Sequence, residues 1–281
     1  PSAPGAAIGV LYLVPTPIGN LEDVTLRSLR VLREAGLILA EDTRTTRRLL
    51  DRYKITGQLE SYTEHSHAVR APRVMEALAT SDVALVSEAG MPGINDPGQG
   101  LVAEVVTAGY QVIGLPGASA VPLAVAVAGF PITSFTYLGF LPHRSAERRK
   151  LLTANGWSGH TLVGFETPHR VLASLRDLEA VLGDRRLAVC RELSKLHEEV
   201  FRGSAATAIE HFSTPKGEFT LVIEGAEPQK WDQADAAGLD IFLRERRASG
   251  GSARDTVAAA AARFGVSRRA AYAAWEALKT E

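Results

Sequence analysis

Two carboxylates, Glu88 and Asp96, lie within the sequence VALVSEAGMPGINDPGQG, which spans residues 83–100. The apolar run 83–86 has the length of a buried strand, and helical spacing of apolar residues resumes over 99–107. Both acids therefore lie in a loop that joins a strand to a helix, where α/β proteins bind ligands. The stretch predicts either a ligand-binding loop or a tight connection with solvated acids.

A second polar set is the EDTR tetrad, residues 41–44, which follows the apolar run 37–40. Adjacent charges of both signs at the end of a buried strand are costly to desolvate unless they pair or meet a ligand. We interpret the tetrad as functional because of this position. The alternative is that EDTR and RELSK (191–195) only form ion pairs between two halves of the chain.

Small residues and prolines follow two further strands. The loop PTPIGN (15–20) is rigid, and because it is not GxGxxG, the dinucleotide-binding fingerprint is absent. The loop PGASA (116–120) lets a ligand approach the backbone closely, ahead of a helix whose first N–H groups are free. The alternative for PGASA is close packing of a helix on the sheet.

The elements that position these loops alternate between strand and helix. Strands are predicted over 8–14, 37–40, 83–86 and 111–115, in a half that we count as five-stranded. Helices are predicted to about residue 35 from a cap at Asp23 or Thr25, and over 45–53, 68–79, 99–107 and 120–128. This alternation is typical of a parallel sheet covered by helices on both faces.

The rhythm changes after Gly129-Phe130-Pro131. Strands are predicted over 135–140, 161–166, 187–193, 199–203 and 219–224, with helices over 146–154, 170–182 and 205–212. Several strands with fewer helices indicate a second, mixed-sheet α+β lobe. A basic cluster at 144–150 in this lobe is either a solvated helix face or a rim that faces phosphate.

The C-terminal segment has helical spacing over 239–248, 252–264 and 267–279, with Ser252 and Ser267 as candidate N-caps. A helix, a short glycine-containing turn and a second helix form a helix-turn-helix pattern. From residue 241 onward there are eight Lys/Arg against four Asp/Glu. Basic residues at the start of the last helix predict phosphate or base contacts; the alternative is a packed helical cap.

These patterns divide the chain into five parts. We expect a frayed start at 1–9, an N-terminal α/β lobe at 10–129, a C-terminal α+β lobe at 130–226, a linker at 227–238 and a small helical domain at 239–281.

The composition excludes several classes of protein. The 281 residues are 46% hydrophobic and 22% charged, which is ordinary for a globular chain. The single Cys190 excludes an internal disulfide framework and fits a reducing cytoplasm, and no Cys or His spacing suggests a metal site. No apolar run reaches membrane-spanning length, and the first residues lack the features of a signal peptide. The net charge of −1 argues against attraction of the whole chain to nucleic acid.

Eight motifs follow one another in the order and spacing of a known family. They are TPIGNLEDVTLRSLRVL, EDTRTTRRLL, VSEAGMPGINDPG, PGASA, GFLPHR, FETPHR, RELSK and KGEFTLVIEG. Over about residues 11–225 the chain resembles the bacterial 16S ribosomal RNA cytidine 2′-O-methyltransferases, which have the tetrapyrrole methylase fold. The resemblance implies S-adenosylmethionine as donor, bound between two lobes, a ribose 2′-hydroxyl of 16S RNA in the small ribosomal subunit as acceptor, and a homodimer.

The resemblance also implies site residues. The donor pocket is expected to use Pro15, Gly19, Glu88, Gly90, Met91, Ile94, Ser119, Ala120, Phe165, Glu166, Glu218 and Phe219. RNA contacts are expected from Arg144, Arg148, Arg149, Arg170, Arg268 and Arg269. The family usually has Asp at the position of Glu88 and Ser at the position of Asn95.

A ribose hydroxyl is a poor nucleophile that benefits from a positioned base and from positive charge near the developing alkoxide. The polar residues that the donor does not need are the catalytic candidates: Glu41, Asp42, Arg44, Arg191, Glu192 and Lys195. Lys195 or a carboxylate of EDTR is expected to act as the base, with Arg44 and Arg191 holding phosphate.

The same sequence is compatible with two alternative functions. One is a small-molecule methylase of the same fold that acts on a tetrapyrrole-type substrate, against which the EDTR and RELSK motifs and the basic C-terminal helices argue. The other is a non-catalytic RNA-binding assembly factor, against which the intact donor loops argue.

Overall fold

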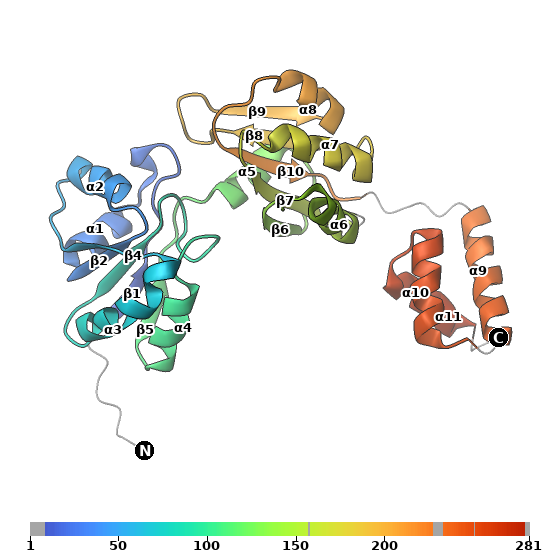
Figure 1. Cartoon of the computed structure of the whole chain (residues 1–281), viewed down its shortest axis with the longest axis horizontal. Coiled ribbons are helices and arrows are strands. Elements are labelled where there is room, and N and C mark those ends of the chain that lie inside the picture. The colour runs from blue at the N-terminus through green and yellow to red at the C-terminus, as the bar shows by residue number, and fades with distance from the viewer. Residues whose placement is uncertain (1–8, 157, 227–232, 250, 279–281) are drawn as a thin grey trace, which may run out of the picture. The chain divides into compact units, whose positions relative to one another are not determined.

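The computed structural model describes residues 9–156, 158–226, 233–249 and 251–278. It forms two compact units, residues 1–226 and 227–281. The first unit contains two five-stranded sheets, and the second consists of helices (Figure 1).

The first sheet has the strand order β3-β2-β4-β1-β5, and every pairing in it is parallel. Its strands are β1 (Val10–Leu13), β2 (Leu37–Ala40), β3 (Leu59–Ser61), β4 (Val83–Val86) and β5 (Gln111–Gly114). Parallel strands share the direction of their carboxyl ends, so the loops after β1, β2, β4 and β5 leave the same edge of the sheet. The predicted parallel sheet is confirmed.

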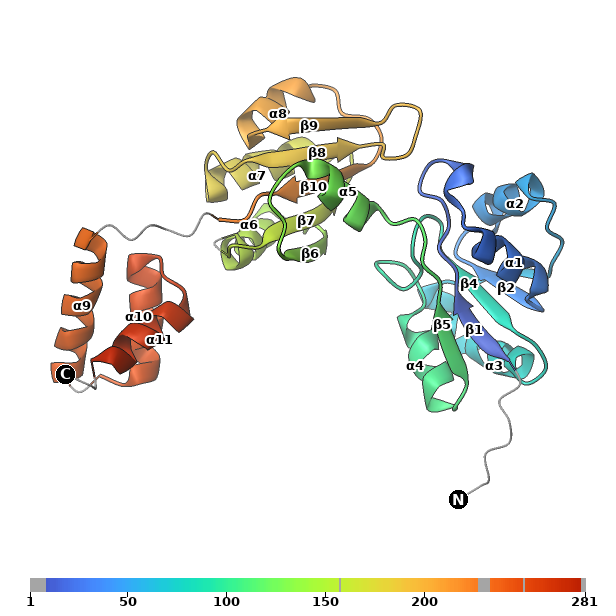
Figure 2. The same ribbon diagram turned by 180° about the vertical axis from the view of Figure 1, so that it is seen from behind.

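Helices cover both faces of this sheet. They are η1 (Leu21–Asp23), α1 (Leu26–Glu34), α2 (Thr43–Arg52), η2 (Glu64–Ser66), α3 (His67–Leu78) and α4 (Gln99–Thr107). On β2, Ile38 and Ala40 pack with α1 and α2, whereas Leu37 and Leu39 pack with α3 and α4 (Figures 1 and 2). This alternation explains why the strand is an unbroken apolar run.

The second sheet is mixed, as predicted. Its order is β6-β7-β10-β8-β9, in which β6 and β7 are parallel and the other pairs are antiparallel. The strands are β6 (Phe135–Phe140), β7 (Thr161–Glu166), β8 (Leu187–Arg191), β9 (Glu199–Gly203) and β10 (Phe219–Ile223).

Four helices cover the second sheet: α5 (Ala120–Ala128), α6 (Ser145–Asn155), α7 (Val171–Leu182) and α8 (Ala205–His211). Helices α6, α7 and α8 pack on one face with Leu162 and Leu221. Helix α5 packs on the other face with Val163 and Val222. Although α5 precedes residue 129 in sequence, its apolar side belongs to the core of the second sheet.

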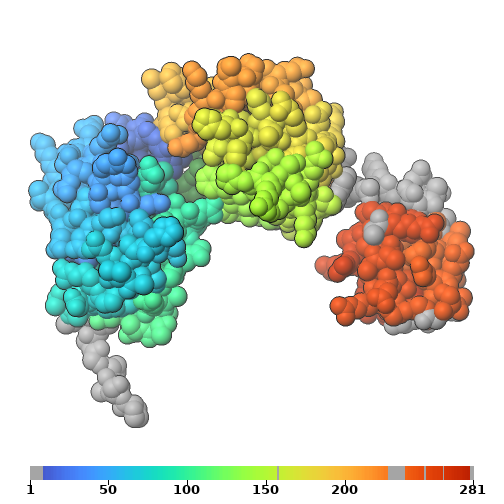
Figure 3. Space-filling view, viewed as in Figure 1, coloured from blue at the N-terminus to red at the C-terminus, as the bar shows by residue number. Residues whose placement is uncertain are grey.

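The second unit contains α9 (Gln233–Ala248), α10 (Ala253–Phe264) and α11 (Arg268–Ala277). Ser252 and Ser267 cap α10 and α11 by accepting hydrogen bonds from the N–H groups of Asp255 and Ala270, as predicted. Leu243, Ala260 and Trp275 share one core, and the atoms of this unit form one continuous body in the space-filling view (Figure 3).

The structure differs from the predicted element ranges at three places, and two of these lie partly outside the described residues. Strand β3 has no counterpart among the predicted ranges. Residues 233–238 of the expected linker begin α9, while 227–232 lie outside the described residues. Residues 1–8 of the expected frayed start are likewise outside, but the N–H of Gly9 donates to the carbonyl of Leu78 at 3.0 Å, so Gly9 is fixed.

The Arg148–Asp177 pair joins α6 to α7 inside the second lobe. Both side chains are buried, and the Arg148 Nε and Nη2 atoms donate to Asp177 Oδ2 at 2.8 and 2.5 Å. Ser145 and Arg149 also donate to this carboxylate. Breaking a buried pair from one side leaves an uncompensated charge, which is far more costly than breaking an exposed pair.

We expect Arg148→Met to lower the free energy of unfolding by about 3–5 kcal/mol, because Asp177 stays buried without its main partner. Arg144→Met is the control: its side chain is exposed and its Glu147 contact is long at 3.4 Å, so the change stays within about 1 kcal/mol. Urea denaturation of both variants measures the difference. Equal stability of the two variants would contradict the structural role of Arg148.

Candidate active site at the strand ends

The loops after β1 and β4 are joined to each other by their backbones. The N–H of Thr16 donates to the carbonyl of Gly90 and the N–H of Gly90 donates to the carbonyl of Thr16, both at 2.9 Å. The buried side chains of Thr16 and Ser87 add hydrogen bonds to the carbonyls of Ser87 and Gly90. This pairing fixes the central loop, residues 87–98, against the loop that contains Pro15 and Gly19.

The loop after β5 lies against the same two loops. A Cβ at Gly117 would lie 2.7 Å from the Cβ of Pro15, so only glycine fits there. Gly90 has φ +86°, and a Cβ on it would meet Ile18 at 3.5 Å and lie within 4 Å of Ala118 and Ser119. Three of the predicted donor loops therefore converge, as their shared sheet edge requires.

Three carboxylates interact at this edge. Burial, together with the nearby charges of Glu41 and Glu88, raises the pKa of Asp96 to about 6. The pKa of Glu41 is also raised, first by burial and then by Glu88. Like charges in a partly buried cluster favour retention of a proton, which is the condition expected of an acid or base that works near neutral pH.

The central loop also reaches β6 of the second sheet. Asn95, with φ +62°, lies against Gly139, where a Cβ would be 3.3 Å from the Asn95 amide nitrogen. The Tyr137 hydroxyl is buried; the Asn95 side chain approaches it, but no group among the described residues meets it at the distance and angles of a hydrogen bond. Burial and the charge of Asp96 raise the pKa of Tyr137 to about 12, so it is a neutral phenol.

An apolar surface connects the two lobes beside these polar groups. Ile18 and Ala120, from the loops of the first sheet, pack in one cluster with Tyr137 and Phe165 of the second. The Tyr137 and Phe165 rings meet edge to face at 5.4 Å between centroids. In the central loop, Ile94 is exposed, whereas Met91 is half-buried.

The RELSK and KGEF motifs meet where β8 ends and β10 begins. Glu192 accepts a hydrogen bond from the N–H of Glu218 at 2.9 Å, and Lys195 Nζ lies 2.9 Å from Glu192 and 3.1 Å from Glu218. Burial alone lowers the pKa of Lys195, but the hydrogen bonds to both carboxylates outweigh it and the pKa is raised. Lys195 is therefore an ammonium, which cannot accept a proton.

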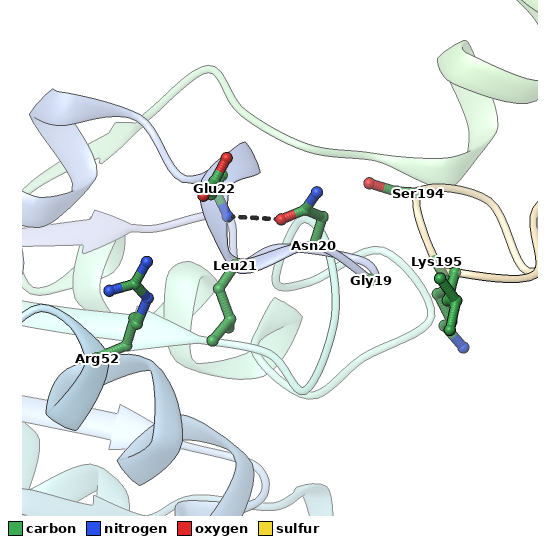
Figure 4. A pocket seen from close by; sticks show the side chains of 8 residues that line it. Gly19, Asn20, Leu21, Glu22, Arg52, Ser194 and Lys195 are labelled. Atoms are coloured by element: carbon green, nitrogen blue, oxygen red, sulfur yellow. Dashed lines mark hydrogen bonds between the residues drawn. The ribbon is translucent and has the colours of Figure 1, made fainter.

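The RELSK loop touches the first lobe. Ser194 Oγ donates to Asp23, and a Cβ on Gly19 would lie 2.4 Å from the Lys195 Cγ. An open pocket of about 450 Å³ lies at this contact, lined by residues 19–22, Arg52 and 194–196 (Figure 4).

The remaining catalytic candidates have different surroundings. Asp42 caps α2 and is hydrogen bonded by Arg44, which lowers the pKa of Asp42 to about 2 and makes it a weak base. Arg44 stays exposed. Arg191 is held by Glu199 at 2.9 Å and by the carbonyl of Lys216 at 2.8 Å. These partners stabilise the end of β8 and leave Arg191 less available to a phosphate than Arg44.

Two donor-site predictions place side chains on the wrong face of the second sheet. Glu166 is buried, accepts from Ser174 of α7 at 2.5 Å and pairs with Arg170 at 2.6 Å. Phe219 packs against Phe212 in the same core. Side chains alternate along strands, so Phe165 faces α5 whereas Glu166 faces α7. Glu166 and Phe219 therefore serve the core and cannot line a pocket at the first lobe with their side chains.

The predicted RNA-binding arginines divide into two that are largely buried in the second lobe and four that are exposed. Arg148 is buried on Asp177, and Arg170 is largely buried between Glu166 and the carbonyl of Leu141. Both predictions are corrected to structural roles, because neither guanidinium reaches solvent freely. The exposed ones are Arg144, Arg149, and, on the separate helical unit, Arg268 and Arg269.

Sequence reasoning did not select several residues that the structure brings to the site: Asn20, Leu21, Arg52, Ser194, Leu196 and Tyr137. The sequence places Asp96 in the ligand-binding loop, but the family motifs do not mark it as a site residue. The adjacency of Asn20 and Leu21 to the PTPIG loop is a signal that could have found them. No such sequence signal marks Tyr137, because its burial depends on tertiary packing.

Within the described ranges, no helix combines the length and apolar character needed to cross a membrane. Among the same residues, no group of three or more His, Cys, Asp and Glu side chains is arranged to hold a metal ion.

We expect Tyr137→Phe to leave the free energy of unfolding unchanged or to raise it by about 1 kcal/mol, because it removes a buried hydroxyl that lacks a partner. Tyr62→Phe is the matched control, since the buried Tyr62 hydroxyl bonds to His67 Nδ1 at 2.6 Å. That change is expected to cost about 1–2 kcal/mol. Calorimetric unfolding compares them; a larger loss for Tyr137→Phe would show that the Tyr137 hydroxyl is satisfied.

Comparisons with known proteins agree with this architecture. The family model for tetrapyrrole (corrin/porphyrin) methylases matches residues 10–209. In solved structures, uroporphyrin III C-methyltransferase from Thermus thermophilus superposes with a TM-score of 0.57 at 19% identity, covering 77% of this chain and 97% of that one. A diphthine synthase gives 0.62 at 14% identity, covering 77% and 90%. These two likenesses show the fold.

Curated relatives are much closer in sequence. The protein named Ribosomal RNA small subunit methyltransferase I from Thermotoga maritima is 47% identical over 78% of this chain and all of its own length. The protein of that name from Bacillus subtilis is 36% identical over 95% of this chain and 94% of its own. The chain therefore belongs to the tetrapyrrole (corrin/porphyrin) methylase family, among the relatives named Ribosomal RNA small subunit methyltransferase I.

Proposed function

We propose that the chain transfers a methyl group from S-adenosylmethionine to the ribose 2′-hydroxyl of a cytidine in 16S RNA of the small ribosomal subunit. The relatives' name supports the substrate class. The observation that carries the reaction is the meeting of two partly buried carboxylates, Glu41 and Asp96, with the exposed Glu88 at the strand-end loops of the first sheet. Both are features of a site that moves a proton beside a bound ligand.

The converging loops fit S-adenosylmethionine. The buried Tyr137 hydroxyl lacks a partner among the described residues, and Ile18 and Phe165 give an apolar wall beside it. Gly90 closes the loop pairing with Thr16, and Ser119 does not use its hydroxyl to cap α5. Pro15, Gly19, Glu88, Met91, Ile94, Ala120 and Glu218 complete the proposed set of donor-binding residues.

When bound, S-adenosylmethionine supplies a methyl group on a positively charged sulfur, which needs no further activation. The chain's residues must align the acceptor hydroxyl and take its proton. Asp96 and Glu41 fit the role of base better than Lys195 or Asp42, because their raised pKa values lie nearer to neutrality. Lys195, as an ammonium, stabilises the developing alkoxide.

The exposed arginines fit phosphate contacts. Arg44 lies at the strand ends, and Arg144 and Arg149 lie on α6. Arg268 and Arg269 lie at the start of α11, the second helix of the helix-turn-helix pattern. A cytoplasmic homodimer acting on RNA completes the proposal.

The test is methyl transfer from labelled S-adenosylmethionine to purified small ribosomal subunits, followed by nucleoside analysis. We expect 2′-O-methylcytidine. Label on a base, or no label on RNA although the donor binds, would reject the proposal in favour of another acceptor.

If Asp96 is the base, kcat/KM increases about tenfold for each unit of increasing pH up to about pH 6 and is constant above it. The reason is that protonated Asp96 cannot accept a proton. We expect Asp96→Asn to lower kcat roughly 10²- to 10⁴-fold and to remove this limb. Asp42→Asn is the control, since the pKa of Asp42 of about 2 lies below the range measured. Retention of the limb in Asp96→Asn would assign it to another group.

We expect Lys195→Met to lower kcat roughly 10²- to 10³-fold with unchanged donor affinity, because the ammonium acts on charge that develops in the transition state. Lys216→Met, on the exposed segment before β10, is the matched control and should keep full activity. Titration calorimetry measures donor affinity alongside turnover. Full activity of Lys195→Met removes this residue from the mechanism.

A further inference from the structure

The pocket beside Lys195 is built from both lobes. Residues 19–22 come from the loop after β1 and from η1, Arg52 ends α2, and residues 194–196 follow β8 (Figure 4). Its volume of about 450 Å³ is in the range of sites that take small molecules or single nucleotides.

Two leucines expose apolar surface at this pocket. Leu196 is 93% exposed and Leu21 is 38% exposed, and they come from different loops. Exposed apolar side chains are ordinary singly, but here both line one hollow. The flat faces of a nucleobase pack against such side chains when a base leaves its stack.

The polar groups present a defined donor and an acceptor. Asn20 Oδ1 accepts from the N–H of Glu22 at 3.1 Å, so the Asn20 amide nitrogen keeps its two donors, and the close view shows it turned away from that bond. The described residues provide it with no other partner. Glu22 lines the same pocket and has no ion pair within the described ranges.

Arg52 adds a cation at the pocket. Its guanidinium lies 5.9 Å from the centroid of the Tyr53 ring, and no carboxylate pairs with it among the residues that the structure describes. The Tyr53 hydroxyl donates to the carbonyl of Leu21 at 2.8 Å, which ties this end of α2 to the pocket. An unpaired arginine beside a base-sized hollow suits a phosphate.

We propose that this pocket holds the acceptor nucleotide and selects cytosine over uracil, with Asn20 donating to the base acceptors, Glu22 accepting from the exocyclic amine and Arg52 binding a phosphate. This inference rests on the proposed function. Cytosine presents an amino donor beside ring acceptors, whereas uracil presents a carbonyl acceptor beside a ring N–H. The Asn20–Glu22 pair complements the first pattern and opposes the second.

The pair of substitutions Asn20→Asp and Glu22→Gln tests the selection. Aspartate keeps the oxygen that caps η1 but replaces the free donor with an acceptor, and glutamine adds a donor that a uracil carbonyl can use. Glu34→Gln, on the exposed face of α1, is the control. The assay compares kcat/KM on small subunits that carry C or U at the nucleotide the wild type modifies.

The wild type is expected to prefer C, and the double variant to shift the C/U ratio toward U by roughly tenfold to hundredfold, with unchanged affinity for S-adenosylmethionine. An unchanged ratio in the double variant, while the wild type still makes 2′-O-methylcytidine, overturns the pocket and leaves the proposed function standing. Failure of the wild type to methylate subunit RNA rejects the proposed function itself.

Leu196→Ser keeps the inference testable if the double variant does not fold, because an exposed side chain is not needed for the core. We expect it to raise KM for subunits at least tenfold with donor affinity unchanged. Arg52→Met is expected to reduce the salt dependence of subunit binding by about one charge. An unchanged KM in Leu196→Ser, or a change in its oligomeric state instead, overturns base packing in this pocket.

Discussion

The backbone pairing of Thr16 with Gly90 is the constraint on which the site depends. It holds the loop after β1 against the loop after β4, and the loop after β5 then packs on both through Pro15 and Gly117. Backbone hydrogen bonds between buried loop residues resist rearrangement because each broken group would be left without a partner. The strand-end loops are thus ordered by their own contacts before any ligand binds, which is what alignment of two reactants requires.

Charge in the site is divided between the lobes. The first lobe places Glu41 and Asp96 near each other and near the exposed Glu88, and burial together with these like charges raises the pKa values of Glu41 and Asp96. The second lobe places Lys195 between Glu192 and Glu218, which keep it charged. In the proposed reaction the first lobe would supply the proton acceptor and the second lobe the cation that stabilises the developing alkoxide.

The extent to which sequence predicts this structure varies with the residues. The position of the central loop is predictable because an apolar run followed by Gly and Pro marks the end of a strand. Strand β3 was missed because it has three residues, lies at the sheet edge and has no buried residue. Arg148 was assigned to RNA because its partner, Asp177, lies 29 residues away and is invisible to local pattern. The prediction for Glu166 is wrong because the motif identifies the strand but does not show on which face of the sheet each side chain lies.

The most direct measurement of the central claim is hydrogen–deuterium exchange of the full chain with and without S-adenosylhomocysteine, the demethylated donor. If the strand-end loops form one donor site, exchange slows together in residues 15–20, 87–98 and 116–120. Protection of only one of these loops, or protection confined to the helical unit, would contradict a single site built on the first sheet.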